Sequence, residues 1–324
     1  MLTAVRRRTG PLVTLAVALT VSAGLVVADQ PAARADEPYK RLVAEKKRDP
    51  RIPGDDVHLR VADLNALFTL STNKFVAQLR MLRDMDPQVI LLQEVADRGR
   101  VLNTWAKRNG YRIWLPGGPR AHVKNHSVVL WKDSGRFQVL ARELRLGSTA
   151  LTRPGGGHVG VRYLSTVRMR DRRSNQRISF TSTHATPDAY VKADGRWRPR
   201  WGSEALTKFR RHMRRTRELV NANGSSLSVI GGDFNAAHRY EKDWYGFMSD
   251  RFGDLLRSNH QSLGRIGTMT TKNGWAFNYI YTNRKPRRIG YAAARVYDTY
   301  SDHHAVVVDF RVKQWKNPQP RVGR

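Results

Sequence analysis

The sequence contains no cysteine among its 324 residues. This absence excludes disulfide bonds, thiolate nucleophiles and cysteine-ligated zinc, and it is silent on the cellular compartment. Acidic residues are also scarce, because 27 Asp and Glu stand against 58 Lys and Arg, for a formal net charge of +31. A charge so far from zero indicates polyanionic partners, anionic surfaces or phosphate esters, and the alternative is a general arginine bias of the source proteome.

The chain also lacks internal repeats, low-complexity segments and a Pro/Gly-rich linker that would divide it. With 40% hydrophobic residues it can bury a sizeable core, and we expect one catalytic domain over residues 57–312. An exposed leader over 36–56 and a loose basic tail over 313–324 flank this domain. Predicted strands mix with helices and several strands are joined by hairpins, which favours an α/β (α+β) architecture with helices outside mixed sheets.

The N-terminus has the form of a signal peptide. Arg6 to Arg8 precede an apolar run from Leu12 to Ala28, and Ala33 to Ala35 offer a small-x-small cleavage site. This pattern predicts a signal peptide over residues 1–35, cleavage after Ala35 and a secreted protein without a stable membrane span. The alternative is an uncleaved N-terminal anchor.

Hydrophobic periodicity places helices between the strands. We expect helices after Ser71, over 101–108 and over 203–222, a long loop over 185–202, and a helical stretch near 243–250. Strands are expected over 57–65, 89–92, 111–115, 127–131, 137–143, 160–170, 176–184, 227–230, 276–282, 289–297 and 305–312.

Polar side chains flank apolar strands at five places. Strand alternation sends Asp233 and Asn235 to one side, and Gly231 and Gly232 let another group approach the backbone there. Each place alone has an ordinary explanation, such as a turn after a core strand, but five in one chain argue against coincidence. The five are Asn65, Glu94, His184, Asp233 with Asn235, and the cluster Ser301 to His304 before the last strand.

The residue types at these strand ends suit phosphate-ester chemistry. Mg²⁺ prefers carboxylate and amide oxygens, few protein ligands and room for phosphates. Hydrolysis also needs a group that orients and deprotonates water, and a donor for the charge that develops on phosphorus. The Asn, Glu, Asp and two His residues supply that set. They predict a phosphoesterase that depends on Mg²⁺, or alternatively on Mn²⁺ or Ca²⁺.

Five short motifs also stand in the order of a known superfamily. They are Asp63-Leu64-Asn65, Leu92-Gln93-Glu94, Ser182-Thr183-His184, Gly232-Asp233-Phe234-Asn235 and Ser301-Asp302-His303. In these motifs the chain resembles the endonuclease/exonuclease/phosphatase superfamily, over about Val57 to Phe310. The resemblance implies a four-layer sandwich of two mixed β-sheets flanked by helices, with the active site at one edge of the sandwich.

The resemblance further implies a metal site. Glu94 is expected as the principal Mg²⁺ ligand, with Asn65 beside it, and Asp302 is expected to complete or support the site. These three residues supply the oxygen ligands that a hard divalent cation prefers.

The resemblance implies catalytic roles for four other residues. Asp233 would orient or activate the attacking water, and Asn235 would help hold the water and the phosphate. His184 would stabilise the non-bridging phosphate oxygens, and His303 would serve in acid–base or transition-state charge work. We expect His304 to be structural, because adjacent strand residues point to opposite faces.

Two positions depart from the superfamily pattern. Where the superfamily usually has an Asp that supports the last His, this chain has Asn278. An Asn can accept a hydrogen bond from the His303 imidazole but cannot lend a negative charge, so we expect His303 to be less easily protonated than in relatives. The second departure precedes Ser127, where nucleases often carry Tyr or Glu and this chain has Lys124 to His126.

Basic segments favour nucleic acid as the substrate. Arginines contact backbone phosphates and tryptophans stack on bases, so we expect a nuclease without sequence specificity that acts on DNA, RNA or both. We also expect the protein to be a monomer. The alternative for the arginine-rich helix over 203–222 is a solvated face. The substrate-binding candidates are Arg196, Trp197, Arg198, Arg200 and Trp201.

Two other functions stay open. A sphingomyelinase-like enzyme or another phosphoester phosphatase would use the same chemistry, and Trp197 and Trp201 would then dock on a membrane of anionic lipid. A non-catalytic relative that binds polyanions is the third reading, which Asn278 keeps open.

Overall fold

The computed structural model describes residues 57–122, 124–153, 156–193, 196–222, 227–236, 255–258, 271–272, 277–283 and 288–315. The predicted signal peptide, the leader, the helical stretch near 243–250 and the tail beyond residue 315 lie outside the described residues. All described residues belong to one compact unit. No helix formed by the described residues has the length and apolarity that a membrane crossing requires.

Two mixed six-stranded sheets build this unit. The first contains, in spatial order, β15 (Ile289–Tyr297), β16 (Ala305–Val312), β1 (Val57–Asn65), β2 (Val89–Gln93), β4 (Ser127–Lys132) and β3 (Tyr111–Trp114). The second contains β13 (Leu255–Ser258), β14 (Asn278–Asn283), β12 (Leu227–Asp233), β9 (Gln176–His184), β8 (Arg162–Asp171) and β5 (Phe137–Ser148). In each sheet one central pair is parallel, β1 with β2 and β12 with β9, and the remaining neighbours are antiparallel.

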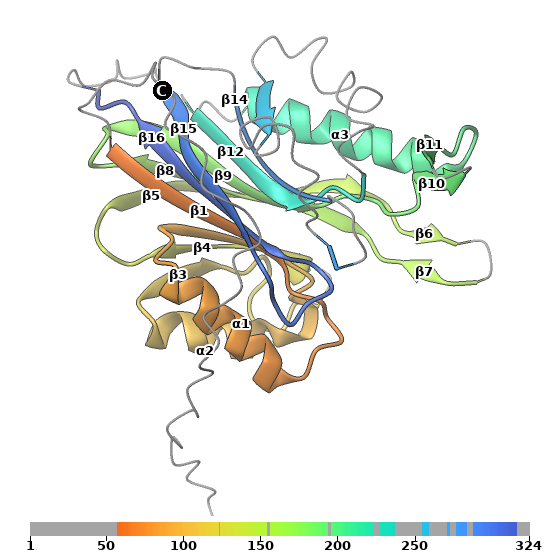
Figure 1. Ribbon diagram of the computed structural model, residues 1–324, viewed down its shortest axis with the longest axis horizontal. Coiled ribbons are helices and arrows are strands. Elements are labelled where there is room, and N and C mark those ends of the chain that lie inside the picture. The colour runs from red at the N-terminus through yellow and green to blue at the C-terminus, as the bar shows by residue number, and fades with distance from the viewer. Residues whose placement is uncertain are drawn as a thin grey trace, which may run out of the picture. The chain divides into compact units, whose positions relative to one another are not determined.

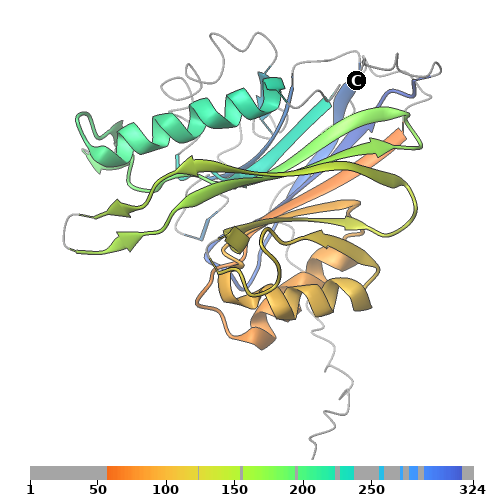
Figure 2. The same ribbon diagram turned by 180° about the vertical axis from the view of Figure 1, so that it is seen from behind.

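Helices cover the outer face of each sheet. The helices α1 (Thr72–Asp84) and α2 (Gly99–Arg108) pack on the first sheet, and α3 (Glu204–Ala222) packs on the second (Figures 1 and 2). The order of layers is therefore helices, sheet, sheet, helix. The predicted four-layer sandwich of two mixed sheets flanked by helices is confirmed.

Alternation along the strands fills three apolar layers. On β1, Val61 points between the sheets, whereas Leu64 faces α1 and α2. On β12, Val229 points between the sheets and Ile230 faces α3. Each side chain of this size stabilises the fold by roughly 1.5–3 kcal/mol when it is fully buried. The strands therefore need both faces covered, which explains their continuous apolar runs.

Helix α1 begins and ends where local chemistry predicts. The Ser71 hydroxyl accepts a hydrogen bond from the Lys74 N–H at 3.4 Å, which caps the first turn. Phe75 and Leu79 lie on the buried face. The chain leaves the helix at Asp86, whose φ of 57° no α-helix tolerates, just before Pro87.

The segment predicted as a loop over 185–202 contains a hairpin instead. β10 (Tyr190–Ala193) pairs in antiparallel fashion with β11 (Arg196–Pro199). The hairpin is anchored because the buried Tyr190 ring packs edge-on against Phe209 of α3, with 5.6 Å between ring centroids. Other short elements are β6 (Leu151–Thr152), β7 (His158–Val159) and the 3₁₀ turns η1 (Ala96–Arg98) and η2 (Lys124–His126).

The expectation of a loose tail is wrong for residues 313–315. The Trp315 N–H donates to the Ser174 carbonyl at 2.8 Å, and the Arg288 guanidinium lies 4.6 Å from the Trp315 ring centroid. The backbone hydrogen bond fixes this segment to the turn between β8 and β9, and the cation–π contact fixes it to the residue before β15.

Candidate active site

The layer between the two sheets changes from apolar to polar toward one edge. In both parallel pairs the carboxyl ends of the strands meet at the same edge, which gathers their last side chains. Burial of so many polar groups is costly unless they bond to one another or to a ligand. These buried polar residues are Asp63 and Asn65 on β1, Gln93 on β2, Ser182 and His184 on β9, and Asp233 on β12.

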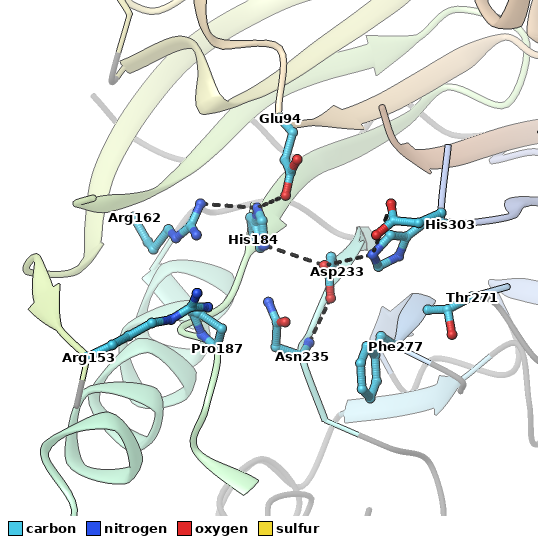
Figure 3. A pocket seen from close by; sticks show the side chains of 11 residues that line it. Glu94, Arg153, Arg162, His184, Pro187, Asp233, Asn235, Thr271, Phe277 and His303 are labelled. Atoms are coloured by element: carbon cyan, nitrogen blue, oxygen red, sulfur yellow. Dashed lines mark hydrogen bonds and ion pairs between the residues drawn. The ribbon is translucent and has the colours of Figure 1, made fainter. Parts of the chain in front are cut away.

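At this edge lies a pocket of about 260 Å³ (Figure 3). Most of the predicted catalytic and metal-binding residues line it, while Asn65 and Asn278 are buried beside it and bond to lining residues. The lining residues are Glu94, Arg153, Arg162, His184, Pro187, Asp233, Asn235, Thr271, Phe277, Asp302 and His303.

Two glycines let β12 reach the pocket. A Cβ on Gly232 would lie 1.9 Å from the Thr183 carbonyl oxygen, and a Cβ on Gly231 would lie 2.5 Å from a methyl group of Leu91. The predicted close approach is therefore confirmed. It brings Asp233 level with His184 on the neighbouring parallel strand.

Glu94 and Asp233 place two carboxylates side by side. The Asn65 amide bridges them, because its Nδ2 donates to Glu94 Oε1 at 3.2 Å and to Asp233 Oδ2 at 3.0 Å. The other oxygen of Glu94 accepts from the Phe68 N–H at 3.0 Å. The backbone of Glu94 also has a φ of 58°, a value that residues other than glycine rarely adopt. Strain of this kind is common where a fold aims a side chain at a ligand.

These carboxylates form an oxygen-rich set suited to a hard cation. Within the described part of the chain, neither Glu94 nor Asp233 forms an ion pair with a lysine or arginine. The basic side chains that pair with these carboxylates are histidines. Asp233 Oδ2 lies 3.4 Å from His184 Nε2 and 3.6 Å from His303 Nε2. Asp302 adds a half-exposed carboxylate to the same pocket. The donor set fits Mg²⁺, which takes few protein ligands and keeps positions for water and phosphate.

The described residues contain no group of three or more His, Asp or Glu side chains that could hold a metal ion. A site that holds Mg²⁺ through one or two carboxylates, together with substrate phosphates, does not need such a cluster.

Arg162 determines which nitrogen of His184 carries the proton and helps to keep the ring neutral. This buried guanidinium donates to His184 Nδ1 at 3.2 Å and also to His126 Nε2. Because Nδ1 accepts, His184 carries its proton on Nε2, which faces Asp233 and the pocket. Burial, and next the charge of Arg162, lower the pKa of His184 well below its usual value, so the ring is neutral at neutral pH. Burial likewise lowers the pKa of His126 to about 3.

His303 is held from behind by a chain of buried polar groups. Its Nδ1 lies 2.5 Å from Asn278 Oδ1, which confirms that Asn278 supports this imidazole. The Asn278 Nδ2 donates to Asp63 Oδ2 at 2.9 Å, and Gln93 Nε2 donates to Asp63 Oδ1 at 2.9 Å. Burial raises the pKa of Asp63 to about 7, although the hydrogen bonds from Asn278 and Gln93 act in the opposite direction.

Asn235 lies in the turn after β12 and lines the pocket, whereas His304 does not line it. The Asn235 N–H donates to Asp233 Oδ1 at 2.8 Å and its side chain donates to the Ala185 carbonyl at 3.0 Å, which fixes the turn after β12. His304 points elsewhere, with Nδ1 3.2 Å from Asp298 Oδ1, in agreement with a structural role.

No protein-family model and no curated protein matches the sequence, but solved structures match its fold. An endonuclease/exonuclease/phosphatase from Bacteroides vulgatus is 14% identical, with a TM-score of 0.59 over 79% of this chain and 100% of that one. This chain has the endonuclease/exonuclease/phosphatase fold. The human Nocturnin catalytic domain with bound sulfate is 18% identical, with a TM-score of 0.57 over 80% and 96%. D. rerio TDP2 in complex with a single-strand DNA product is 14% identical, with a TM-score of 0.57 over 79% and 99%.

On this fold, the described part of the predicted substrate-binding segment does not line the pocket. Among the described residues that line the pocket, none comes from the segment 196–201. The Trp201 side chain is 71% exposed and lies under the Arg210 guanidinium, 4.8 Å from the ring centroid. A contact between Trp201 and a longer substrate stays a prediction. The same applies to Arg196, Trp197, Arg198 and Arg200.

Sequence reasoning missed three residues that the fold brings to the site. Arg153 and Arg162 carry no signal of their own in a chain with 58 Lys and Arg. Asp63 has one, because strand alternation puts it on the same face as Asn65. A carboxylate on the buried face of a predicted strand needs a partner, and that need was the available clue.

Proposed function

We propose that this protein is a divalent-metal-dependent phosphodiesterase. One observation carries the proposal: Glu94 and Asp233 share a pocket with a neutral His184 and with Arg162, which donates a hydrogen bond to His184. Within the described chain, neither carboxylate forms an ion pair with a lysine or arginine. Proteins of the same fold support it. They include ANGEL2, a 2',3'-cyclic phosphatase, in complex with adenosine-2',3'-vanadate, and a mannosyl-6-phosphatase from Bacteroides thetaiotaomicron.

In this proposal Glu94 holds the cation, with Asn65 and Asp302 completing or supporting the site. The cation, Mg²⁺ or alternatively Mn²⁺ or Ca²⁺, would neutralise negative charge on the phosphate oxygens. Asn65 additionally keeps the two carboxylates together through its amide protons.

The remaining lining residues act on water and phosphate. Asp233 orients the attacking water and takes its proton, and the Asn235 N–H on its other oxygen fixes the carboxylate. His184 presents Nε2–H to a non-bridging phosphate oxygen, because Arg162 occupies Nδ1. His303 presents Nε2 on the opposite side of Asp233, where it stabilises charge or moves a proton in the transition state.

Nucleic acid is the proposed substrate. The net charge of +31 favours a polyanion, and Arg153 and Arg162 face the pocket itself. D. rerio TDP2, which shares the fold, has been solved with a single-strand DNA product. Contacts made mainly to backbone phosphates carry no sequence information, so cleavage without sequence preference is expected.

We also propose that the protein is exported. The proposal rests on the pattern of residues 1–35, in which a basic start precedes an apolar run and a small-x-small site. Mass spectrometry of protein recovered from the culture medium tests it, with Asp36 expected as the first residue. Recovery of the full-length chain from the cell fraction alone would contradict it.

Supercoiled plasmid is the first substrate to test. Purified protein with Mg²⁺ is expected to nick it, and EDTA is expected to abolish the nicking. His303→Ala removes a pocket residue and should be inactive. His304→Ala is the matched control, because it deletes the adjacent imidazole that pairs with Asp298 outside the pocket.

The outcomes separate the candidate functions. An intact plasmid together with EDTA-sensitive hydrolysis of sphingomyelin, or of a small phosphate ester, would retain the chemistry and replace the substrate. DNA binding without hydrolysis of any of these esters would favour a non-catalytic polyanion-binding protein. Equal activity of His303→Ala and His304→Ala would contradict the proposed site.

A further inference from the structure

Asp63 is a buried carboxylate that the catalytic scheme above does not use. It is fully buried on β1, and within the described residues no lysine or arginine forms an ion pair with it. Its two oxygens instead accept one amide proton each, from Gln93 and from Asn278, both at 2.9 Å. Burying a carboxylate on neutral donors alone is costly, so its presence at this position calls for a reason.

The contacts of Asp63 fix which way the Asn278 amide points. An ionised Asp63 can only accept, so Asn278 turns its Nδ2 toward Asp63, and its Oδ1 then faces His303 Nδ1 at 2.5 Å. An amide oxygen can only accept, so the proton of the imidazole must sit on Nδ1. His303 Nε2 is then left to face Asp233 Oδ2, at 3.6 Å, and the pocket.

We propose that Asp63 is a positioning residue that acts through Asn278 to hold His303 as the Nδ1–H tautomer with Nε2 toward the pocket. The three residues come from β1, β14 and the segment before β16, so both sheets contribute to the relay. A carboxylate placed directly on the imidazole would orient it in the same way. Here an amide separates the two groups. The kinetic consequence rests on the proposed function, whereas the tautomer does not.

Exchanging the two side chains tests the relay. In Asp63→Asn, the new amide receives the Gln93 proton on its oxygen and points its own protons at Asn278 Nδ2. Gln93 resists turning because the same amide group donates to Ser182 Oγ at 3.1 Å. Asn278 must therefore flip, and His303 Nδ1 must become an acceptor. In the double variant Asp63→Asn/Asn278→Asp every donor again meets an acceptor, with the carboxylate now on His303.

The ring ¹⁵N shifts of His303 in long-range ¹H–¹⁵N spectra report the tautomer without substrate or metal. We expect Nδ1–H in the wild type, Nε2–H or a mixture in Asp63→Asn, and Nδ1–H again in the double variant. In Mg²⁺-dependent hydrolysis of bis(p-nitrophenyl) phosphate, kcat of Asp63→Asn should fall roughly 10–100-fold at unchanged KM and recover in the double variant.

Asp171→Asn is the matched control. Asp171 is also fully buried, but it pairs with Arg136 at the far end of β8, so this variant should lose stability and keep the His303 tautomer and kcat. Nε2–H in the wild type overturns the proposal directly, even where Asp63→Asn fails to fold. An unchanged tautomer in Asp63→Asn, or no recovery in the double variant, also overturns it. Tautomers that follow the exchange in a protein that hydrolyses no ester would refute the proposed function and leave the relay standing.

Discussion

Arg162 shows how one buried cation governs its neighbours at the scale of single residues. It keeps His126 and His184 as neutral acceptors, and its Nε is buried without a hydrogen-bond partner among the described atoms. Arg162 also lines the pocket, where a guanidinium can bind an anion. The neutral His184 beside it adds a donor that costs no net charge.

Replacing Arg162 with Met should therefore impair phosphate hydrolysis. We expect kcat/KM for bis(p-nitrophenyl) phosphate to fall by about 10²–10³, the usual effect of removing one donor to a developing oxyanion. Arg170→Met, on the same strand but exposed and bonded to Asn175, is the control. A kcat/KM equal to that of the control would show that Arg162 only supports the fold.

Buried His212 should make the protein sensitive to acid. Its Nε2 lies 2.7 Å from Thr183 Oγ1, and burial lowers its pKa to about 3. The unfolded chain binds a proton below about pH 6.5, whereas the native His212 does not. Its contribution to the free energy of unfolding is therefore fully present above about pH 6.5. This contribution is lost as the pH falls toward 3, by up to about 1.4 kcal/mol per pH unit.

Urea denaturation between pH 4 and 7 measures this share. His212→Gln keeps a polar group at the position without a group that titrates there, so its stability should fall less steeply with decreasing pH than that of the wild type. Parallel pH dependences of the two proteins would contradict a neutral native His212.

At the scale of elements, the sequence predicts where polar residues lie but not which ones meet. The ends of β1, β9 and β12 are readable because alternation and the paired glycines are local signals. The contact between Asp63 and Asn278 joins residues 215 positions apart, and no local pattern encodes it. The hairpin β10–β11 was missed for a similar reason, since its anchor Tyr190 packs on a helix that follows it in the chain.

The junction of β9 and β12 should tolerate no side chain at Gly232. A Cβ there would lie 1.9 Å from the Thr183 backbone oxygen, so Gly232→Ala must separate the two strands. We expect a loss of about 1–3 kcal/mol or more in the free energy of unfolding, measured by urea denaturation. Gly160→Ala is the control, because a Cβ at Gly160 meets no atom within 4 Å. Equal midpoints for the two variants would contradict the tight junction.

At the scale of the whole molecule, the net charge acts over a longer range than the contacts in the pocket. The net charge of +31 acts on a long polyanion far beyond the pocket, whereas a small ester meets only the lining residues. Salt screens the first effect within about 10 Å at 0.1 M and leaves short contacts in a partly buried pocket much less affected.

Salt should therefore separate the two kinds of substrate. Between 50 and 200 mM NaCl we expect KM for DNA to rise by roughly 10³ or more if six or more phosphates are neutralised. KM for bis(p-nitrophenyl) phosphate should change little over the same range. Equal salt dependence for both substrates would indicate that the basic surface takes no part in binding DNA.

The pairing of β1 with β16 also has a consequence for when activity begins. β1 opens the described domain and lies between β2 and β16. Val57 of β1 pairs with Val312 of β16, which is made 255 positions later (312 − 57). A chain still on the ribosome already holds Glu94 and Asp233, but it has neither His303 nor the strand that closes the first sheet. For an enzyme of the proposed kind, we therefore expect activity only after the last strand of the first sheet has been made.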